Sequence, residues 1–181
     1  MKKTSVPKQG LIHKKDKNKV RIRKDHKNKI SSILISPTYI NKKIKYLAKN
    51  IVDDAKKNNI NKLEIVVVLK GAAIFANILV QEIFSCGGPG LRVNYIKASS
   101  YKGKTSSSGK VAVEGDLKYL KDKYVIIVED IIDTGLTITK IKKHLLVQCK
   151  ASSVKICALL NKEARRISRL KGKINIEYKG F

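Results

Sequence analysis

The stretch VIIVEDIIDTGLT, residues 125–137, decides the fold, because it joins a buried strand to the start of a helix. The apolar residues ahead of Glu129 predict a strand, and the Thr-Gly pair after Asp133 predicts a tight turn into a helix. In α/β folds, ligands bind at the carboxyl ends of the parallel strands. The acidic residues of this stretch therefore stand where such a fold binds its ligand.

The chemistry of the same stretch suits a sugar phosphate. Backbone N–H groups at a helix start can bind a phosphate, and the hydroxyls of Thr134 and Thr137 add donors. The neighbouring carboxylates of Glu129 and Asp130 suit sugar hydroxyls or a magnesium ion. A D-T-G sequence alone would favour a helix-capping turn with solvated acids, but two further acids after an apolar strand favour a ligand site. A Walker phosphate loop is excluded, because the chain has no G-x-x-x-x-G-K-S/T sequence.

Apolar runs on both sides of this stretch alternate between strand and helix patterns. Helical spacing and helix-friendly composition predict helices over residues 36–58, 72–84 and 137–147. Short apolar runs predict strands over residues 63–69, 91–98, 124–128, 154–160 and 174–178. Strands that alternate with helices predict an α/β fold, with a mostly parallel sheet and helices on both faces.

Composition narrows the class of protein. A chain of 181 residues with 43% hydrophobic residues predicts one domain with a real core. No apolar run approaches the roughly 20 residues of a membrane span, and three cysteines without metal-ligand spacing favour a reducing cytoplasm. The net charge of +26 comes mainly from lysine. It indicates either a compositional bias or a surface that binds nucleic acid.

Two segments have too few apolar residues to form a core. Residues 1–29 predict a flexible basic tail, which is either an inert extension or an arm that touches RNA, so the folded domain is expected over residues 30–181. Residues 99–110, SSYKGKTSSSGK, predict a mobile loop. Arg165, Arg166 and Arg169 are interpreted as a solvated face, with a tetramer or RNA contact as the alternative.

Residues 129–135, EDIIDTG, closely resemble the phosphoribosyl diphosphate signature of hypoxanthine-guanine phosphoribosyltransferases. Three more segments resemble that family in order and spacing, namely VLKGA at 68–72, the Ser-rich loop at 99–109, and ALLNK at 158–162. The resemblance covers about residues 33–181. It implies the type I phosphoribosyltransferase fold.

The resemblance implies how the sugar diphosphate is held. Lys70 and Gly71 would meet the diphosphate, and Glu129 and Asp130 would hold the ribose hydroxyls and help to bind Mg²⁺. The loop would close over the reaction and exclude water. The full set implied to bind phosphoribosyl diphosphate is Lys70, Gly71, Ser100, Tyr101, Glu129, Asp130, Thr134, Gly135, Leu136 and Thr137.

Two residues are implied to act on the purine. Asp133 would lie beside N7 and accept its proton as the purine attacks the anomeric carbon. Lys162 would donate to the 6-oxo group of hypoxanthine or guanine, and it would disfavour adenine, which carries an amino group at that position.

The implied function is purine salvage. The chain would transfer 5-phosphoribosyl to hypoxanthine or guanine, with Mg²⁺, and give IMP or GMP and diphosphate. A cytoplasmic homodimer or homotetramer without membrane contact is implied. The alternative hypothesis is an RNA-binding regulator that keeps the fold but has no turnover.

The sequence departs from the family after Lys162. Relatives continue beyond a strand like residues 174–181 with an aromatic residue that stacks on the purine, a metal-binding aspartate and the last part of the hood. Tyr178 and Phe181 match core strand positions, so neither is assigned the stacking role. We therefore expect an incomplete hood, measurable binding of phosphoribosyl diphosphate and poor turnover of purine.

Overall fold

The computed structural model describes residues 33–100, 111–114 and 117–181. The helices are α1 (Pro37–Lys57), α2 (Ala73–Ser85) and α3 (Leu136–Val147). The strands are β1 (Lys62–Leu69), β2 (Gly90–Ser100), β3 (Val111–Glu114), β4 (Tyr124–Ile132), β5 (Ser153–Asn161) and β6 (Tyr178–Lys179). Short 3-10 helices occupy Lys118–Leu120, Glu163–Arg165 and Ser168–Leu170. No helix in these ranges is long and apolar enough to span a membrane.

The strands form one sheet in the order β3-β2-β1-β4-β5-β6. All neighbours pair in parallel except β2 and β3, which are antiparallel, so the prediction of a mostly parallel sheet is confirmed. Val67 of β1 pairs with Val128 of β4. This register brings the turn after β1 beside the acidic end of β4.

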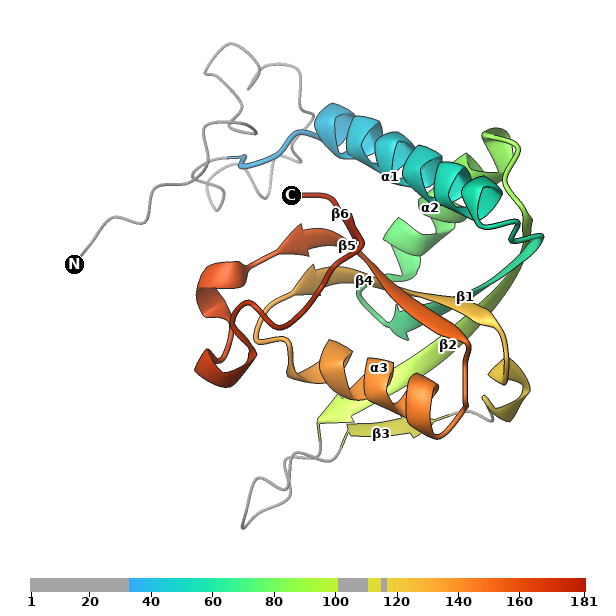
Figure 1. The fold of residues 1–181 in the computed structure, drawn as a ribbon. Coiled ribbons are helices and arrows are strands. Elements are labelled where there is room, and N and C mark those ends of the chain that lie inside the picture. Colours follow the sequence, from blue (N-terminus) through green and yellow to red (C-terminus); the bar gives the residue numbers. More distant parts are fainter. Residues whose placement is uncertain (1–32, 101–110, 115–116) are drawn as a thin grey trace. The chain divides into compact units, whose positions relative to one another are not determined.

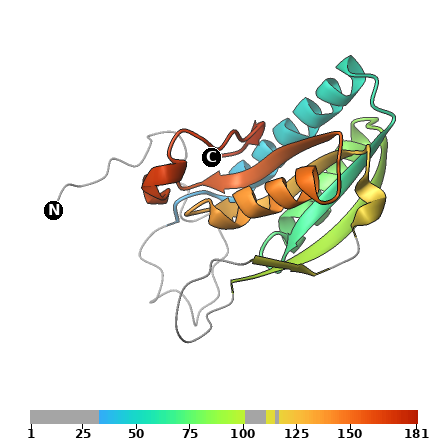
Figure 2. The same ribbon diagram turned by 60° about the horizontal axis from the view of Figure 1, so that its bottom comes forward.

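The helices cover both faces of the sheet, as predicted. Figures 1 and 2 show α3 on one face and α2 on the other. The core beneath α3 consists largely of β-branched and leucine side chains, including Val66, Val125, Ile127, Ile138, Ile141 and Leu145. Because successive strand residues point to opposite faces, the buried Ile65, Val67, Ile126 and Val128 supply the core of the other face.

The first helix begins where the sequence predicts. The Ser36 hydroxyl accepts a hydrogen bond of 3.2 Å from the backbone N–H of Tyr39, and Pro37 opens the helix. This is the arrangement expected of a hydroxyl cap followed by proline at the first helical position.

Three predictions are corrected by the structure. Ser99 and Ser100 belong to β2 and pair with β3, a strand that the sequence analysis did not predict. Residues 174–177 are irregular, and only Tyr178–Lys179 forms a strand. Strand β1 is not wholly apolar, because it buries Glu64, whose carboxylate accepts a 3.1 Å hydrogen bond from Asn94. The predicted tail, residues 1–29, and residues 101–110 of the loop lie outside the described residues.

Candidate active site

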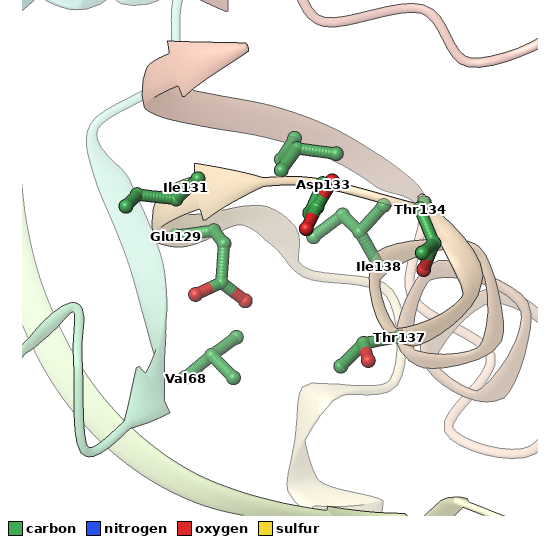
Figure 3. Close-up of a pocket in the computed structure, with 9 residues that line it drawn as sticks. Val68, Glu129, Ile131, Asp133, Thr134, Thr137 and Ile138 are labelled. Atoms are coloured by element: carbon green, nitrogen blue, oxygen red, sulfur yellow. The ribbon is translucent and has the colours of Figure 1, made fainter. Parts of the chain in front are cut away.

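A cavity of about 240 Å³ lies at the carboxyl end of β4, where the strand turns into α3 (Figure 3). Its walls come from the end of β1, the end of β4, the turn and the first turn of α3. The lining residues are Val68, Glu129, Ile131, Ile132, Asp133, Thr134, Gly135, Thr137 and Ile138. The structure thus brings together Glu129, Asp133, Thr134, Gly135 and Thr137 from the predicted site.

The two adjacent acids have different further neighbours, although their carboxylates lie close enough to share a hydrogen bond. Glu129 points into the cavity (Figure 3). Asp130 lies instead against the turn after β1, where a Cβ atom built on Gly71 would be 2.6 Å from its Oδ2. A side chain at position 71 would therefore collide with this carboxylate.

The pKa of Glu129 is raised to about 8, and burial is the main cause. The side-chain hydrogen bond with Asp130 and the negative charge of Asp130 also raise it. Two carboxylates in contact with little compensating charge favour a shared proton or a bound cation. Mg²⁺ in proteins uses one or two carboxylates and completes its shell with water and phosphate oxygens. Glu129 and Asp130 fit that requirement, although the described ranges hold no group of three or more His, Cys, Asp or Glu that could bind a metal.

The turn between β4 and α3 has the backbone expected of an anion site. Gly135 has a φ of +85°, in the left-handed region that glycine adopts without strain, and α3 begins at the next residue. Thr134, Gly135 and Thr137 all line the cavity. The positive end of the α3 dipole therefore borders the cavity, and the N–H groups at this end can bind a phosphate.

The carboxylate of Asp133 lines the same cavity. Its Oδ1 lies 3.1 Å from Nε of Arg165 in an ion pair. No described group makes a hydrogen bond to this buried oxygen. Asp133 is consequently held beside a positive charge with one oxygen able to accept a proton.

The other predicted site residues that the structure describes do not line the cavity. Lys70 and Gly71 form the turn after β1, and both are exposed. The side chain of Lys162 is exposed, while its backbone N–H donates to Ile132 of β4 at 2.9 Å. Ser100 ends β2, and Tyr101 falls outside the described residues.

The interpretation of Arg165, Arg166 and Arg169 as a solvated face is wrong for Arg166, which is buried. Its side chain is only 6% exposed, and it donates to the backbone carbonyl of Asp133 at 3.1 Å and to Oδ1 of Asn161. Sequence reasoning missed this role, because nothing distinguishes one arginine in a chain with 40 basic residues.

Ile131 is a second residue that the sequence analysis missed. It lies at the cavity with 37% of its surface exposed, whereas residues 125–128 of the same strand are buried. The sequence did contain a signal for this residue, namely an isoleucine inside an acidic stretch. An apolar side chain at the ligand-binding end of a strand can contact a flat ring.

The comparisons with known proteins agree with this geometry. Residues 31–179 match the phosphoribosyl transferase domain. The chain is 34% identical over 142 residues to the hypoxanthine-guanine phosphoribosyltransferase of Streptococcus pneumoniae. The matched residues cover 77% of this chain and 74% of that protein. It is 32% identical over 154 residues to the hypoxanthine-guanine-xanthine phosphoribosyltransferase of Tritrichomonas foetus, spanning 84% and 77%.

The chain also resembles solved structures of hypoxanthine and hypoxanthine-guanine phosphoribosyltransferases. The hypoxanthine phosphoribosyl transferase of Trypanosoma cruzi has a TM-score of 0.71 and 31% identity, covering 82% of this chain and 76% of that one. A hypoxanthine-guanine phosphoribosyltransferase of Bacillus anthracis has a TM-score of 0.65 and 33% identity, covering 82% and 79%. These relatives are named as enzymes, and none supports the alternative of an RNA-binding regulator.

Proposed function

Because this chain belongs to the hypoxanthine-guanine phosphoribosyltransferase family, we propose that it transfers 5-phosphoribosyl from phosphoribosyl diphosphate to hypoxanthine or guanine. The products are IMP or GMP and diphosphate, and the role is purine salvage. The observation that carries the proposal is one cavity bordered by Glu129, Asp133 and the start of α3. It combines sites for a sugar, a proton and a phosphate.

The sugar diphosphate extends from α3 to the turn after β1. Its 5-phosphate binds the N–H groups and hydroxyls at residues 134–137, and its ribose hydroxyls donate to Glu129 and Asp130. The diphosphate lies by Lys70 and Gly71, where the missing side chain allows close approach to the backbone. Mg²⁺ held by Glu129 and Asp130 would neutralise charge on the departing diphosphate.

Asp133 acts on the purine. Its carboxylate lines the cavity and accepts the proton from N7 as the purine attacks the anomeric carbon. Lys162 donates to the 6-oxo group, which selects against adenine. Ile131 offers an apolar surface to the purine ring.

The test compares the wild type and two variants of the chain in a nucleotide-formation assay with hypoxanthine, guanine and xanthine. Xanthine is included because the name of the Tritrichomonas relative contains it. The wild type is expected to form nucleotide measurably but slowly, and Asp133→Asn to lose about 10²–10⁴-fold of that turnover. Asp53→Asn, on the exposed side of α1, is the control and is expected to keep full turnover. Absence of nucleotide with every base, or full turnover by Asp133→Asn, contradicts the proposal.

We also propose that the chain self-associates as a homodimer or homotetramer. In the Trypanosoma cruzi enzyme the C-terminal region has a role in oligomeric state and enzymatic activity. Here a different region supports the proposal, since residues 71–91 contain no lysine or arginine although the chain has 40 basic residues. Ile74 and Phe84 on the outside of α2 are 78% and 81% exposed. Two copies with charge +26 repel least where this face meets its copy.

The proposed location is the cytoplasm. Cys86, Cys149 and Cys157 are all free thiols, and two of them are buried. Unpaired cysteines persist in a reducing compartment.

A further inference from the structure

Arg166 is the one buried basic side chain among the described residues. A buried guanidinium requires hydrogen-bond partners, because removing a charge from water costs several kcal/mol or more. Nη1 donates to the carbonyl of Asp133 at 3.1 Å, and Nη2 donates to Oδ1 of Asn161. Both partners are neutral. The positive charge is therefore not cancelled by the groups that hold it in place.

This charge lies directly behind the phosphate turn, residues 133–137, to which the proposed function assigns the 5-phosphate. A Cβ atom built on Gly135 would lie 2.9 Å from both Cδ and Nη1 of Arg166. The glycine thus leaves the space that the guanidinium needs to reach the turn. A positive charge at this depth adds to the field of the α3 dipole at the cavity.

The next residue makes a second contact with the turn. The backbone N–H of Ile167 donates to the carbonyl of Thr134 at 3.3 Å. Two successive carbonyls of the turn, at Asp133 and Thr134, are therefore held by residues 166–167. Because the C=O and N–H of a trans peptide point in opposite directions, the N–H of Thr134 points away from the Arg166 guanidinium. For the same reason, the N–H of Gly135 points away from the N–H of Ile167. Thr134 and Gly135 both line the cavity.

We propose that Arg166 is a positioning residue for the phosphate turn. It fixes the carbonyl of Asp133 so that the following N–H groups face the bound phosphate, and it places an uncompensated positive charge behind them. The inference rests on the proposed function for its ligand, the 5-phosphate of a ribose. It assigns Arg166 no contact with that ligand.

Binding of ribose 5-phosphate, measured by isothermal titration, tests the inference without turnover. Arg166→Met keeps much of the side-chain volume and removes the charge and the donors. We expect the Kd of ribose 5-phosphate to rise at least ~10-fold, because small displacements in a preorganised site cost 10- to 100-fold. Arg166→Lys restores the charge and is expected to recover part of that loss. Arg169→Met removes the same group from an exposed position and should bind like the wild type.

A second measurement separates positioning from general stability. In steady-state kinetics Arg166→Met should raise the KM for phosphoribosyl diphosphate more than the KM for hypoxanthine, whereas a loosened fold would raise both. A folded Arg166→Met variant that binds ribose 5-phosphate within about twofold of the wild type overturns the inference. Where the Met variant does not fold, wild-type affinity of Arg166→Lys for ribose 5-phosphate overturns the inference, because lysine is expected to recover only part of the loss.

The outcomes also distinguish the two proposals. A chain that binds ribose 5-phosphate in an Arg166-dependent way, but makes no nucleotide from any oxopurine, keeps this inference and contradicts the proposed function. A wild type that makes nucleotide, with unchanged kinetics in Arg166→Met, keeps the function and overturns the inference. Failure of the wild type to bind ribose 5-phosphate also overturns it, because no phosphate turn would then exist to be positioned.

Discussion

At the scale of single residues, Gly71 and Asp130 depend on each other. The carboxylate of Asp130 occupies the space in which a side chain at position 71 would lie, with 2.6 Å from a built Cβ to Oδ2. Gly71→Ala is therefore expected to displace Asp130 and to weaken binding of phosphoribosyl diphosphate by at least ~10-fold in isothermal titration. Gly90→Ala is the matched control, because its Cβ would meet only an ordinary contact of 3.5 Å. Equal affinity in the two variants would show that the Asp130 carboxylate has room to move.

Glu129 gives a prediction about pH. Burial, followed by the influence of Asp130, raises its pKa from 4.5 to about 8. The folded protein therefore keeps a proton that the unfolded chain releases, so the free energy of unfolding falls as pH rises from about 4.5 to about 8. Glu129→Gln removes this titration.

The measurement is denaturant unfolding of the metal-free protein across that pH range. The wild type is expected to lose at least ~1 kcal/mol more than Glu129→Gln between the two ends of the range. Parallel curves for the two proteins would mean that the carboxyl of Glu129 titrates at its ordinary value.

At the scale of secondary-structure elements, one polar cluster joins α1 to β5 and β6. Asp54 of α1 accepts hydrogen bonds from Nζ of Lys155 in β5 and, at 2.5 Å, from the hydroxyl of Tyr178 in β6. Burial raises the pKa of Asp54, but these hydrogen bonds outweigh burial and lower it below 3.8. The cluster therefore stabilises the fold above that pH and loses its effect as pH falls below it.

The neighbouring residue provides the control for this cluster. Asp54→Asn is expected to lower the free energy of unfolding at neutral pH by about 1–3 kcal/mol, because the ammonium of Lys155 loses the negative charge that pairs with it. Asp53→Asn removes only an exposed ion pair with Lys49 and should cost less than about 0.5 kcal/mol. Denaturant unfolding measures the free energy of unfolding of both variants. An equal decrease in the two variants would mean that the cluster contributes no more to stability than an exposed ion pair.

At the scale of the whole molecule, charge limits how copies of the chain meet. Phe84→Glu puts a charge on the face of α2 that lacks lysine and arginine, so we expect it to shift the protein toward monomer in sedimentation or light-scattering measurements. Val147→Glu is the control, because Val147 is also exposed, at 54%, but lies on α3. Both variants should keep the wild-type stability. An unchanged mass for Phe84→Glu would place any self-association elsewhere.

Sequence reasoning predicted the parts of this protein that depend on neighbouring residues. The apolar run of β4, the acids after it and the Thr-Gly turn are contiguous, so the strand, the turn and α3 follow from local preferences. The irregular segment at residues 174–177 was predicted wrongly as a strand, because Ile174 and Ile176 have strand periodicity but pack against the core without a continuous partner strand.

The sequence by itself determined the class of fold, and it predicted where the proposed site lies along the chain and which polar residues form it. Only the tertiary structure decided that Asp130 meets Gly71, that Asp54 is paired with residues more than 100 positions away, and that Arg166 lies buried behind the phosphate turn. Local preferences act over a few residues along the chain. Burial and pairing of these side chains depend instead on strands and turns that become neighbours only when the sheet has assembled.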